Sequence, residues 1–323
     1  MPTIRWGLVG CGDVVRKRVA QAVLDEPRSE LVAACRRDKQ RLDEFCDRFQ
    51  IDKRYPRDTD LFTDPDIDAV YIATPVKDHL PQTLAAARAG KHVLVEKPMA
   101  MNVAECTEMI EVCRENDVQL GVAYYRRFYP LVLRIEELLK SGEIGTPLAI
   151  SAVTSTPFAL QSGEEGYWRV IADEGGGGAL MDIGSHRINL FAHLFGGVQQ
   201  VKCICRNVAT NYDAEDTSVM VLGFESGSVG TLQCHFGSAV DPDEFSITGT
   251  LGRLYAAPLN GSELVIETAA GCRTERHDPP PNFCGPLVTD FVSAILEGRS
   301  PRVCGDEGKL TNAIIERGYK DRT

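Results

Sequence analysis

The chain has 323 residues, of which 43% are hydrophobic and 25% are charged, and its formal net charge at pH 7 is −11. This length suggests about two globular domains. The acidic balance argues against a surface that binds nucleic acid or an anionic membrane, because both partners need a cationic footprint. A soluble protein that binds small molecules fits these numbers better.

The eleven cysteines form neither a CxxC pair nor a zinc-ligand spacing. We therefore expect reduced, mostly buried thiols in a reducing compartment. No apolar run approaches the length of a membrane span, and the first expected strand begins near Thr3, which leaves no room for a secretory signal. These features predict a cytoplasmic protein.

Residues 4–9 predict a buried strand that leads into the turn Gly10-Cys11-Gly12-Asp13-Val14, followed by a helix over about residues 16–24. Gly10 permits a tight turn, and Gly12 lets the backbone approach a pyrophosphate that the helix N-terminus attracts. Val15 occupies the place of the third glycine of the dinucleotide fingerprint. We interpret the motif as a dinucleotide-binding turn, with a glycine turn that holds no ligand as the alternative.

The second expected strand, residues 31–35, ends at Arg36-Arg37-Asp38, and Arg41 follows. Arg36 lies about 20 residues beyond Val15, where an acidic residue would bind the ribose 2′-hydroxyl of NAD. An arginine can instead form a forked pair with a 2′-phosphate, so we predict NADP(H), with NAD(H) still possible. A solvated basic turn is the alternative, and Asp38 could still serve a ribose hydroxyl if the turn shifts.

A further strand, from residue 68, ends in the turn Ala73-Thr74-Pro75. His79 opens the next helix, over residues 80–89, and could either line the cofactor site or cap that helix. A helix over residues 103–116 and a strand over 119–123 complete the alternation. This order predicts a doubly wound parallel sheet of Rossmann type, in a first domain that spans residues 1–125.

The short strand at residues 92–95 is followed by Glu96-Lys97-Pro98. Ligands of an open parallel sheet gather beyond the carboxyl ends of its strands, so Lys97 can face a bound cofactor. The alternative is a solvated loop charge, which is the usual role of a surface lysine. The sequence does not tell whether the Lys97-Pro98 peptide is cis.

The second half of the chain begins with a helix over residues 130–140 and continues with strand-like runs. These runs are residues 148–154, 201–207, 218–224, 229–236, 245–249 and 264–268. Because helices rarely intervene, they predict a large, mostly antiparallel sheet in an α+β domain over residues 126–323. A sheet face without helices would expose apolar surface, so we expect a homo-oligomer, a dimer or tetramer, through this sheet.

A helix is predicted from Asp182 to residue 195, after a glycine run at 175–178 that either approaches a ligand or serves as a linker. Asp182, His186, Asn189 and His193 fall within about 60° on this helix, and Ile183, Leu190, Phe191 and Leu194 lie opposite. We interpret the polar stripe as facing a cleft, although a solvated stripe is the common explanation. Asp182, His186 and His193 could also ligate a metal, but no accompanying motif supports this and we expect no metal.

Several motifs together resemble the glucose-fructose oxidoreductase and inositol dehydrogenase family, known as Gfo/Idh/MocA. They are Gly10-Cys11-Gly12, Ala73-Thr74-Pro75, residues 89–93, Glu96-Lys97-Pro98, residues 127–130, Tyr167-Trp168-Arg169 and residues 176–186. The resemblance implies an NAD(P)-dependent oxidoreductase for sugars or polyols, with a Rossmann domain and a second domain built on an antiparallel sheet. It implies that Lys97, Asp182 and His186 are the catalytic lysine, aspartate and histidine.

The resemblance also implies which residues contact the cofactor: Gly10 to Val14, Arg36 to Arg41, Ala73 to Pro75, Glu96, Trp168 and Arg169. The chain departs from the family pattern at Val15, at Asn189, where many members have aspartate, and at residues 282–284, where Phe283 is the only aromatic residue. These departures leave the basic chemistry in place and concern the substrate.

The combined prediction is an NADP(H)-dependent oxidoreductase that moves a hydride between the nicotinamide and a CH–OH or C=O carbon of a sugar, a polyol or a derivative. His186 would be the acid/base, because its intrinsic pKa suits neutral pH. Lys97 would hold the substrate oxygen or itself relay the proton, and Asp182 would orient the site. The alternative is a sensor or scaffold protein that binds NADP(H) without turnover.

Overall fold

The structure, a computed structural model, describes residues 2–321. The chain divides into two compact units, one formed by residues 1–125 and 281–309 and the other by residues 126–280 and 310–323. The first break falls after residue 125, and residues 281–309 cluster with the first unit and not with the second. Residues 1 and 322–323, which belong to the expected domains, lie outside the described part.

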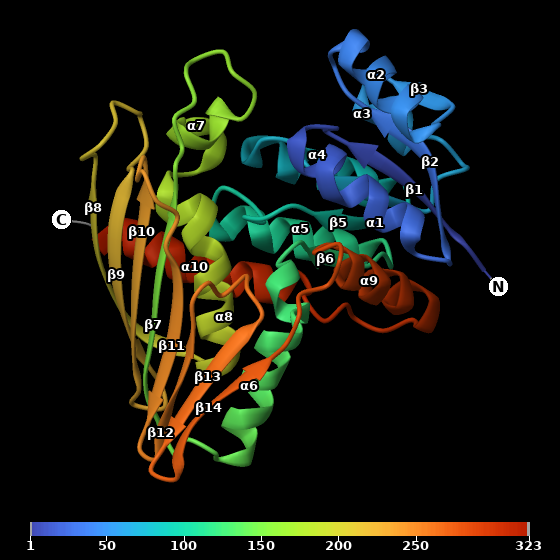
Figure 1. The fold of residues 1–323 in the computed structure, drawn as a ribbon. Helices are drawn as coiled ribbons and strands as arrows, with labels where there is room; N and C mark the ends of the chain where they lie inside the picture. Colours follow the sequence, from blue (N-terminus) through green and yellow to red (C-terminus); the bar gives the residue numbers. More distant parts are fainter. Residues whose placement is uncertain (1, 322–323) are drawn as a thin grey trace. The chain divides into compact units, whose positions relative to one another are not determined.

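The first unit contains a six-stranded parallel sheet with the strand order β3-β2-β1-β4-β5-β6 (Figure 1). The strands are β1 (Ile4–Val9), β2 (Ser29–Cys35), β3 (Lys53–Tyr55), β4 (Ala69–Ile72), β5 (His92–Val95) and β6 (Leu120–Val122). The order reverses between β1 and β4, which is the switch point where ligands of open α/β sheets bind. The predicted Rossmann sheet is confirmed. Strand β3 was not predicted, because its sequence, Lys-Arg-Tyr, has no apolar run.

The helices of the first unit, apart from the last, connect these strands in the expected alternation. They are a π-turn at Val15–Val19 that continues into α1 (Ala20–Asp25), α2 (Lys39–Phe49), α3 (Asp58–Phe62), a 3-10 turn at Val76–Asp78, α4 (His79–Arg88), α5 (Val103–Glu115) and α9 (Gly285–Glu297). Helix α9 returns from far along the chain. Its Phe291 ring lies 5.7 Å from the Trp6 ring, and Thr289 donates a hydrogen bond of 2.6 Å to Glu26. These contacts explain why α9 clusters with this unit.

The second unit contains an eight-stranded sheet with the order β14-β13-β12-β11-β7-β10-β9-β8. The strands are β7 (Pro147–Thr156), β8 (Val198–Arg206), β9 (Thr217–Phe224), β10 (Val229–Phe236), β11 (Asp243–Gly249), β12 (Gly252–Ala256), β13 (Glu263–Thr268) and β14 (Gly271–Arg276). Only β7 and β10 pair in parallel among these strands, so the predicted mostly antiparallel sheet is confirmed. Strands β12 and β14 were not predicted. Strand β14 is almost wholly exposed and has no apolar alternation.

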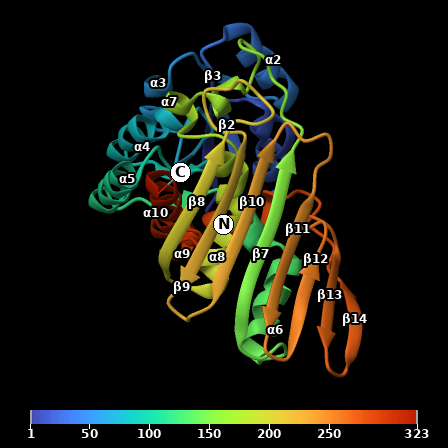
Figure 2. The same ribbon diagram turned by 90° about the vertical axis from the view of Figure 1, so that its left-hand side faces the viewer.

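The helices of the second unit lie on one face of its sheet (Figures 1 and 2). They are α6 (Pro130–Ser141), α7 (Ala172–Gly175), a π-turn at Leu180–Gly184 that continues into α8 (Ser185–Phe195), and the later part of α10 (Gly305–Asp321), with 3-10 turns at Tyr125–Phe128 and Tyr167–Val170. Figure 2 looks onto the opposite face, which no helix of the described part of this unit covers. Apolar side chains on it are exposed, among them Ile204, Val219, Val221 and Val229.

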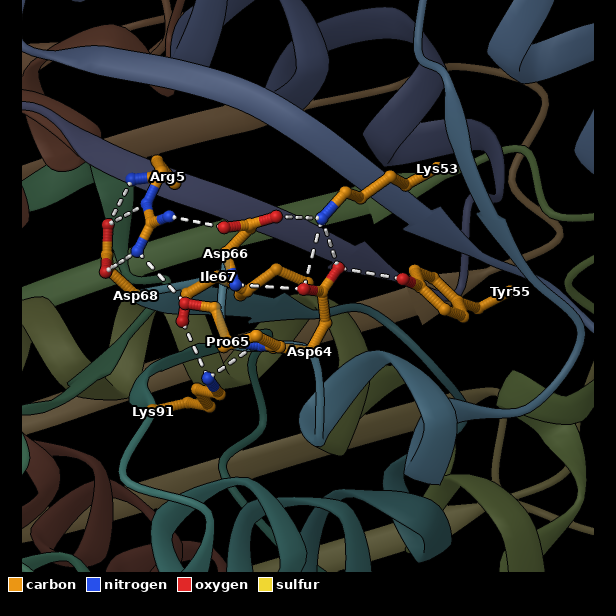
Figure 3. A network of polar contacts seen from close by, with 9 residues as sticks. All are labelled: Arg5, Lys53, Tyr55, Asp64, Pro65, Asp66, Ile67, Asp68 and Lys91. Atoms are coloured by element: carbon orange, nitrogen blue, oxygen red, sulfur yellow. Dashed lines mark hydrogen bonds and ion pairs between the residues drawn. The ribbon is translucent and has the colours of Figure 1, made fainter.

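A polar network links the amino-terminal ends of the strands in the first unit (Figure 3). Arg5 of β1 binds Asp68, which precedes β4, through its backbone N–H and its guanidinium. Lys91, which precedes β5, is 7% exposed and donates to the backbone oxygens of Asp64 and Ile67 at 2.8 and 2.7 Å. The turn before β4 is therefore fixed to two neighbouring strands, at the sheet edge opposite the glycine turn.

Candidate functional site in two parts

The glycine turn after β1 fits a pyrophosphate. Gly10 has a φ of +80°, and a Cβ at this position would lie 2.6 Å from the Ala73 oxygen, so only glycine lets the turns after β1 and β4 approach each other. The helix that begins at Asp13 presents first-turn N–H groups that have no partner inside the helix, and such groups attract anions. Asp13 itself pairs with Arg16 and Lys17, so its negative charge is compensated locally.

The helix widens at the place of the third glycine. Val15 is fully buried and begins the π-turn Val15–Val19. Such turns occur frequently at functional sites. The Cys11 thiol is also buried in the glycine turn and faces the Leu8 and Cys35 oxygens. Burial raises the pKa of Cys11 far above its usual range, so this thiol is not a reactive nucleophile.

The basic turn after β2 meets the glycine turn. The Arg36 guanidinium donates to the Cys11 backbone oxygen, whereas Arg37 and Arg41 are exposed. Asp38 caps α2 by accepting from the Arg41 N–H at 3.0 Å, and the Arg41 guanidinium lies 3.8 Å from it. The carboxylate that could have served a ribose hydroxyl is thus engaged at the start of its own helix.

The Glu96 carboxylate links the Lys97 backbone to the buried side chain of Tyr71. Glu96 accepts a hydrogen bond of 2.7 Å from the Tyr71 hydroxyl and one of 3.0 Å from the Lys97 N–H. Tyr71 is fully buried on β4, and burial raises its pKa well above the usual value, so it remains a neutral donor. Lys97 is half-buried, and the Lys97-Pro98 peptide is cis. The sequence did not point to Tyr71, which reads as an ordinary core residue of a strand.

His79 joins the turns that follow β4 and β5. Its Nε2 lies 3.0 Å from the Thr74 oxygen, and its Nδ1 lies 3.1 and 3.2 Å from the Pro98 and Met99 oxygens. The ring is buried, and burial lowers its pKa. Of the two expected roles, capping α4 is not found, because Asp78 is the N-cap residue and both ring nitrogens of His79 face oxygens of the two turns.

In the second unit, Asp182 lies beside the Trp168-Arg169 pair. The Arg169 Nε atom is 3.8 Å from an Asp182 carboxylate oxygen, and its guanidinium lies over the Trp168 ring, 4.7 Å from the centroid. Asp182 belongs to the π-turn Leu180–Gly184, and the helix after the glycine turn has a similar π-turn at Val15–Val19. The structure brings Asp182 and Arg169 together, which the sequence did not predict.

The interpretation of α8 as half core and half polar stripe is wrong. His186, Arg187 and Asn189 are buried, as are Leu190 and Phe191. Asn189 donates to the Thr311 hydroxyl at 3.1 Å, so this departure from the family pattern serves packing against α10. A solvated stripe is excluded for His186 and Asn189, and the cleft-facing role of His186 stays a prediction.

Arg187 was missed because a single arginine on a helix is normally solvated. It forms a buried ion pair with Asp243 of β11, and Asp243 also accepts from the Asn260 N–H at 2.9 Å. Only the fold brings these distant residues together. The pair fixes α8 against the sheet.

The alternative metal site is not found. Within residues 2–321, no group of three or more His, Cys, Asp or Glu side chains is arranged to hold a metal ion. His193 instead lies 3.4 Å from Glu136 of α6.

Comparison with known proteins decides the family. Residues 4–124 match the model of the oxidoreductase family with an NAD-binding Rossmann fold, and residues 132–255 match the model of the GFO/IDH/MocA C-terminal domain. The chain belongs to the Gfo/Idh/MocA family. It is accordingly an NAD(P)-dependent oxidoreductase.

Relatives of this chain match it over nearly its full length. The trans-1,2-dihydrobenzene-1,2-diol dehydrogenase of Mus musculus is 30% identical and covers 97% of this chain and 91% of its own. The D-xylose 1-dehydrogenase (NADP(+)) 2 of Haloferax volcanii is 30% identical over 98% and 96%. The structure of an aldose-aldose oxidoreductase from Caulobacter crescentus, complexed with glycerol, superposes with a TM-score of 0.91 at 25% identity, covering 99% and 97%.

Two further findings concern this family member. Phe283, at the third departure from the family pattern, stacks on Tyr125 at 6.3 Å and lies under the Arg18 guanidinium at 5.1 Å. Of the helices described, none has the length and apolar character needed to cross a membrane.

Proposed function

We propose that this protein is an NADP(H)-dependent oxidoreductase that transfers a hydride between the nicotinamide and a CH–OH or C=O carbon of a sugar, a polyol or a sugar derivative. The observation that carries the proposal is the arrangement at Lys97. Its backbone N–H is bound by Glu96, which is held in turn by buried Tyr71, at the sheet edge where ligands of Rossmann folds bind. A lysine that served only as a solvated charge would need no such support.

The proposed preference for NADP(H) rests on Arg36. It is half-buried, and it is attached to the glycine turn through the Cys11 oxygen. A guanidinium at this position offers forked hydrogen bonds to a 2′-phosphate. Arg37 and Arg41 add positive charge nearby, and Gly10 to Val14, Ala73 to Pro75, His79, Glu96, Trp168 and Arg169 are the other proposed cofactor residues. The xylose dehydrogenase named above carries NADP(+) in its name, which supports the preference.

The proposed substrate class is a polyhydroxylated small molecule. The names of two relatives refer to D-xylose and to aldoses. A third refers to a ring diol that is not a sugar. The shared chemistry is a secondary or hemiacetal carbinol with a neighbouring hydroxyl, which is the class we assign.

The proposed roles follow from what hydride removal requires. When a carbinol carbon loses a hydride to the nicotinamide, its oxygen must lose a proton, so a base is needed. We assign this proton to His186. Lys97 stabilises the negative charge that develops on the same oxygen, and the Arg169 guanidinium near Asp182 keeps that carboxylate oriented to accept from substrate hydroxyls. Lys97 as the proton relay is the alternative assignment.

The second candidate function is an NADP(H)-binding sensor or scaffold without turnover. A pure binder has no need for Lys97, Asp182 and His186 together.

We also propose a homo-oligomer, a dimer or tetramer, because Ile204, Val219, Val221 and Val229 are exposed on the helix-free face of the second sheet.

A substrate panel tests the proposal. Aldoses, polyols, inositols, keto-sugars and ring diols are assayed in both directions with each cofactor, by nicotinamide absorbance. We expect turnover with at least one of these classes, faster with NADP(H) than with NAD(H). Tight NADPH binding without turnover on any of them would favour the sensor or scaffold, and faster turnover with NAD(H) would contradict the cofactor preference.

A further inference from the structure

The helix that carries Asp182 and His186 needs a fixed axial and rotational position, because both side chains leave it within about one turn. Apolar packing alone tolerates small shifts of a helix, whereas hydrogen bonds with defined geometry do not. The start of this helix, at residues 178–180, is bound by a side chain from a distant segment. That side chain is Glu215, two residues before β9.

Glu215 receives three donors on its carboxylate. The Gly178 N–H donates to Oε2 at 3.0 Å, the Leu180 N–H donates to Oε1 at 3.0 Å, and the Tyr319 hydroxyl of α10 donates to Oε1 at 2.9 Å. The Ala179 N–H adds a bond of 3.1 Å to the Glu215 backbone oxygen. Three successive N–H groups at the helix start are thus satisfied by one residue, which also compensates the positive end of the helix dipole.

The glycine run explains how the partners come so close. A Cβ on Gly178 would lie 1.8 Å from the Glu215 backbone oxygen, and a Cβ on Gly177 would lie 2.1 Å from the Tyr319 hydroxyl. No side chain larger than hydrogen fits at either position. Gly177 and Gly178 are therefore neither a plain linker nor free backbone that awaits a ligand, the two interpretations that the sequence offered.

We call the contacts of Glu215 with residues 178–180 and with Tyr319 the clamp. The clamp is costly for the folded state. Glu215 is 7% exposed, and burial raises its pKa despite the three donors. Burial also raises the pKa of the Tyr319 hydroxyl. A buried carboxylate is weak support for stability, and in some proteins such groups are retained because they specify a geometry. This favours positioning as the role of Glu215.

We propose that Glu215 and Tyr319 are positioning residues that set the placement of Asp182 and His186 for the reaction. The inference rests on the proposed function. Neither residue contacts the reacting atoms in this account. Their effect passes through the backbone at residues 178–180.

The neighbouring Asp216 is the matched control. It is fully buried and also accepts three backbone N–H groups, from Val208, Ala209 and Thr210, at 2.7 to 3.1 Å. These bonds order the loop at residues 208–210 and do not involve the helix. Glu215→Gln and Asp216→Asn therefore alter adjacent buried carboxylates of the same kind, and only one of them holds the helix start.

The experiment compares wild type, Glu215→Gln, Tyr319→Phe and Asp216→Asn as full-length proteins. For Glu215→Gln we expect kcat to fall by about tenfold or more, because small misplacements of reacting groups cost up to about 100-fold. The substrate KM and the NADPH dissociation constant should change less than about twofold, since uniform binding is retained. Tyr319→Phe should show the same pattern at a smaller size, and Asp216→Asn should keep the wild-type kcat.

Amide hydrogen exchange provides a readout without turnover. Glu215→Gln should speed exchange in peptides that cover residues 178–186, and Asp216→Asn should do so at residues 208–210. If Glu215→Gln keeps the wild-type kcat, the inference is overturned, whether or not exchange at 178–186 changes. If kcat falls equally in Asp216→Asn, the effect is general destabilisation and the inference also fails.

The experiment separates failure of the proposed function from failure of the positioning role of Glu215. If the wild type turns over none of the substrates, the proposed function fails, while altered exchange at 178–186 would still support the clamp. If the wild type is active and Glu215→Gln is equally active, only the clamp fails.

Discussion

The two ends of strand β5 each carry a lysine, and the two lysines are treated very differently. Lys91 precedes the strand, is buried, and donates to two backbone oxygens of the turn before β4 (Figure 3). Lys97 follows the strand, is half-buried, and has its backbone N–H held by Glu96. At the amino-terminal end of β5, the Lys91 ammonium group itself makes the structural contacts. At the carboxyl-terminal end, Glu96 holds the backbone of Lys97.

This difference distinguishes the structural charge of Lys91 from the proposed functional charge of Lys97. Burial lowers the pKa of Lys91, which is a cost of using a cation to satisfy buried carbonyl groups. The carboxyl edge is where ligands bind, and there the supporting contacts go to the backbone. The residue type is the same at both ends of β5, and the two positions differ in the atom that makes these contacts, the side-chain nitrogen of Lys91 and the backbone nitrogen of Lys97.

The first prediction tests the functional end. Lys97→Met should lower kcat by about 10²- to 10³-fold, the size expected when one stabilising donor is removed from a developing oxyanion. The melting temperature should stay close to that of the wild type, because the Glu96 bond to the backbone N–H is kept. Steady-state kinetics and thermal unfolding measure both. A fully active Lys97→Met enzyme would assign Lys97 to the solvated-charge alternative.

The second prediction tests the structural end. Lys91→Met should lower the free energy of unfolding by about 2 to 6 kcal/mol, since two buried carbonyl groups lose their donor at about 1 to 3 kcal/mol each. Its kcat at a temperature where the variant is folded should stay within about twofold of wild type. Denaturant titration measures the free energy of unfolding, and steady-state kinetics measures kcat. Loss of kcat without loss of stability would erase the contrast between the two ends of β5.

The third prediction concerns the basic turn at the carboxyl edge. Arg36→Ala should weaken NADPH binding by about tenfold or more, because a charge-assisted hydrogen bond to a phosphate is lost. NADH binding serves as the internal reference and should change much less. Arg54→Ala, on the neighbouring β3 and paired with Asp43 and Asp47, is the control variant. Equal losses for the two cofactors in fluorescence titrations would show that Arg36 only shapes the glycine turn.

The fourth prediction concerns how stability depends on pH through the polar network at the amino-terminal ends of the strands, here called the amino edge. Burial opposes ionisation of Asp64, but hydrogen bonds from Lys53, the Asp66 N–H and Tyr55 outweigh it and lower its pKa from 3.8 to about 2. A lowered carboxyl pKa stabilises the folded state above pH 3.8, and this stabilisation disappears as the pH falls toward 2. Asp64→Asn should therefore cost about 2 kcal/mol at neutral pH and almost nothing near pH 2.

Denaturant unfolding as a function of pH measures this effect, with the exposed Glu30→Gln as the control. A cost for Asp64→Asn that is the same at pH 2 and pH 7 would mean that the ionised carboxylate does not hold this edge. The amino edge would then lack the electrostatic role described here.

The sequence predicted what local pattern determines. The strands β1, β2, β4 and β5, the glycine turn and Lys97 after β5 follow from apolar runs and turn residues that are adjacent in the chain. Each of these positions is defined within about ten residues. The strands of this sheet and the turns that follow them could therefore be predicted before the fold was known.

The contacts that the sequence did not predict join segments that are distant in the chain. Arg187 pairs with Asp243, and Glu215 binds Gly178 and Tyr319. Nothing near these residues in the chain signals their partners, since helical periodicity describes which face is apolar and not which polar group finds a buried partner. The stripe on α8 was misinterpreted for this reason.

The most direct test of the central claim is isotope transfer from the cofactor. NADPH that carries deuterium at both positions of C4 of its reduced nicotinamide is incubated with the protein and a carbonyl substrate from the panel, and the product is analysed by mass spectrometry. The account predicts deuterium on the new carbinol carbon of the product in the wild type, formed about 10² to 10⁴ times more slowly in His186→Ala. Undeuterated product, or unchanged NADPH alongside full cofactor binding, would contradict it.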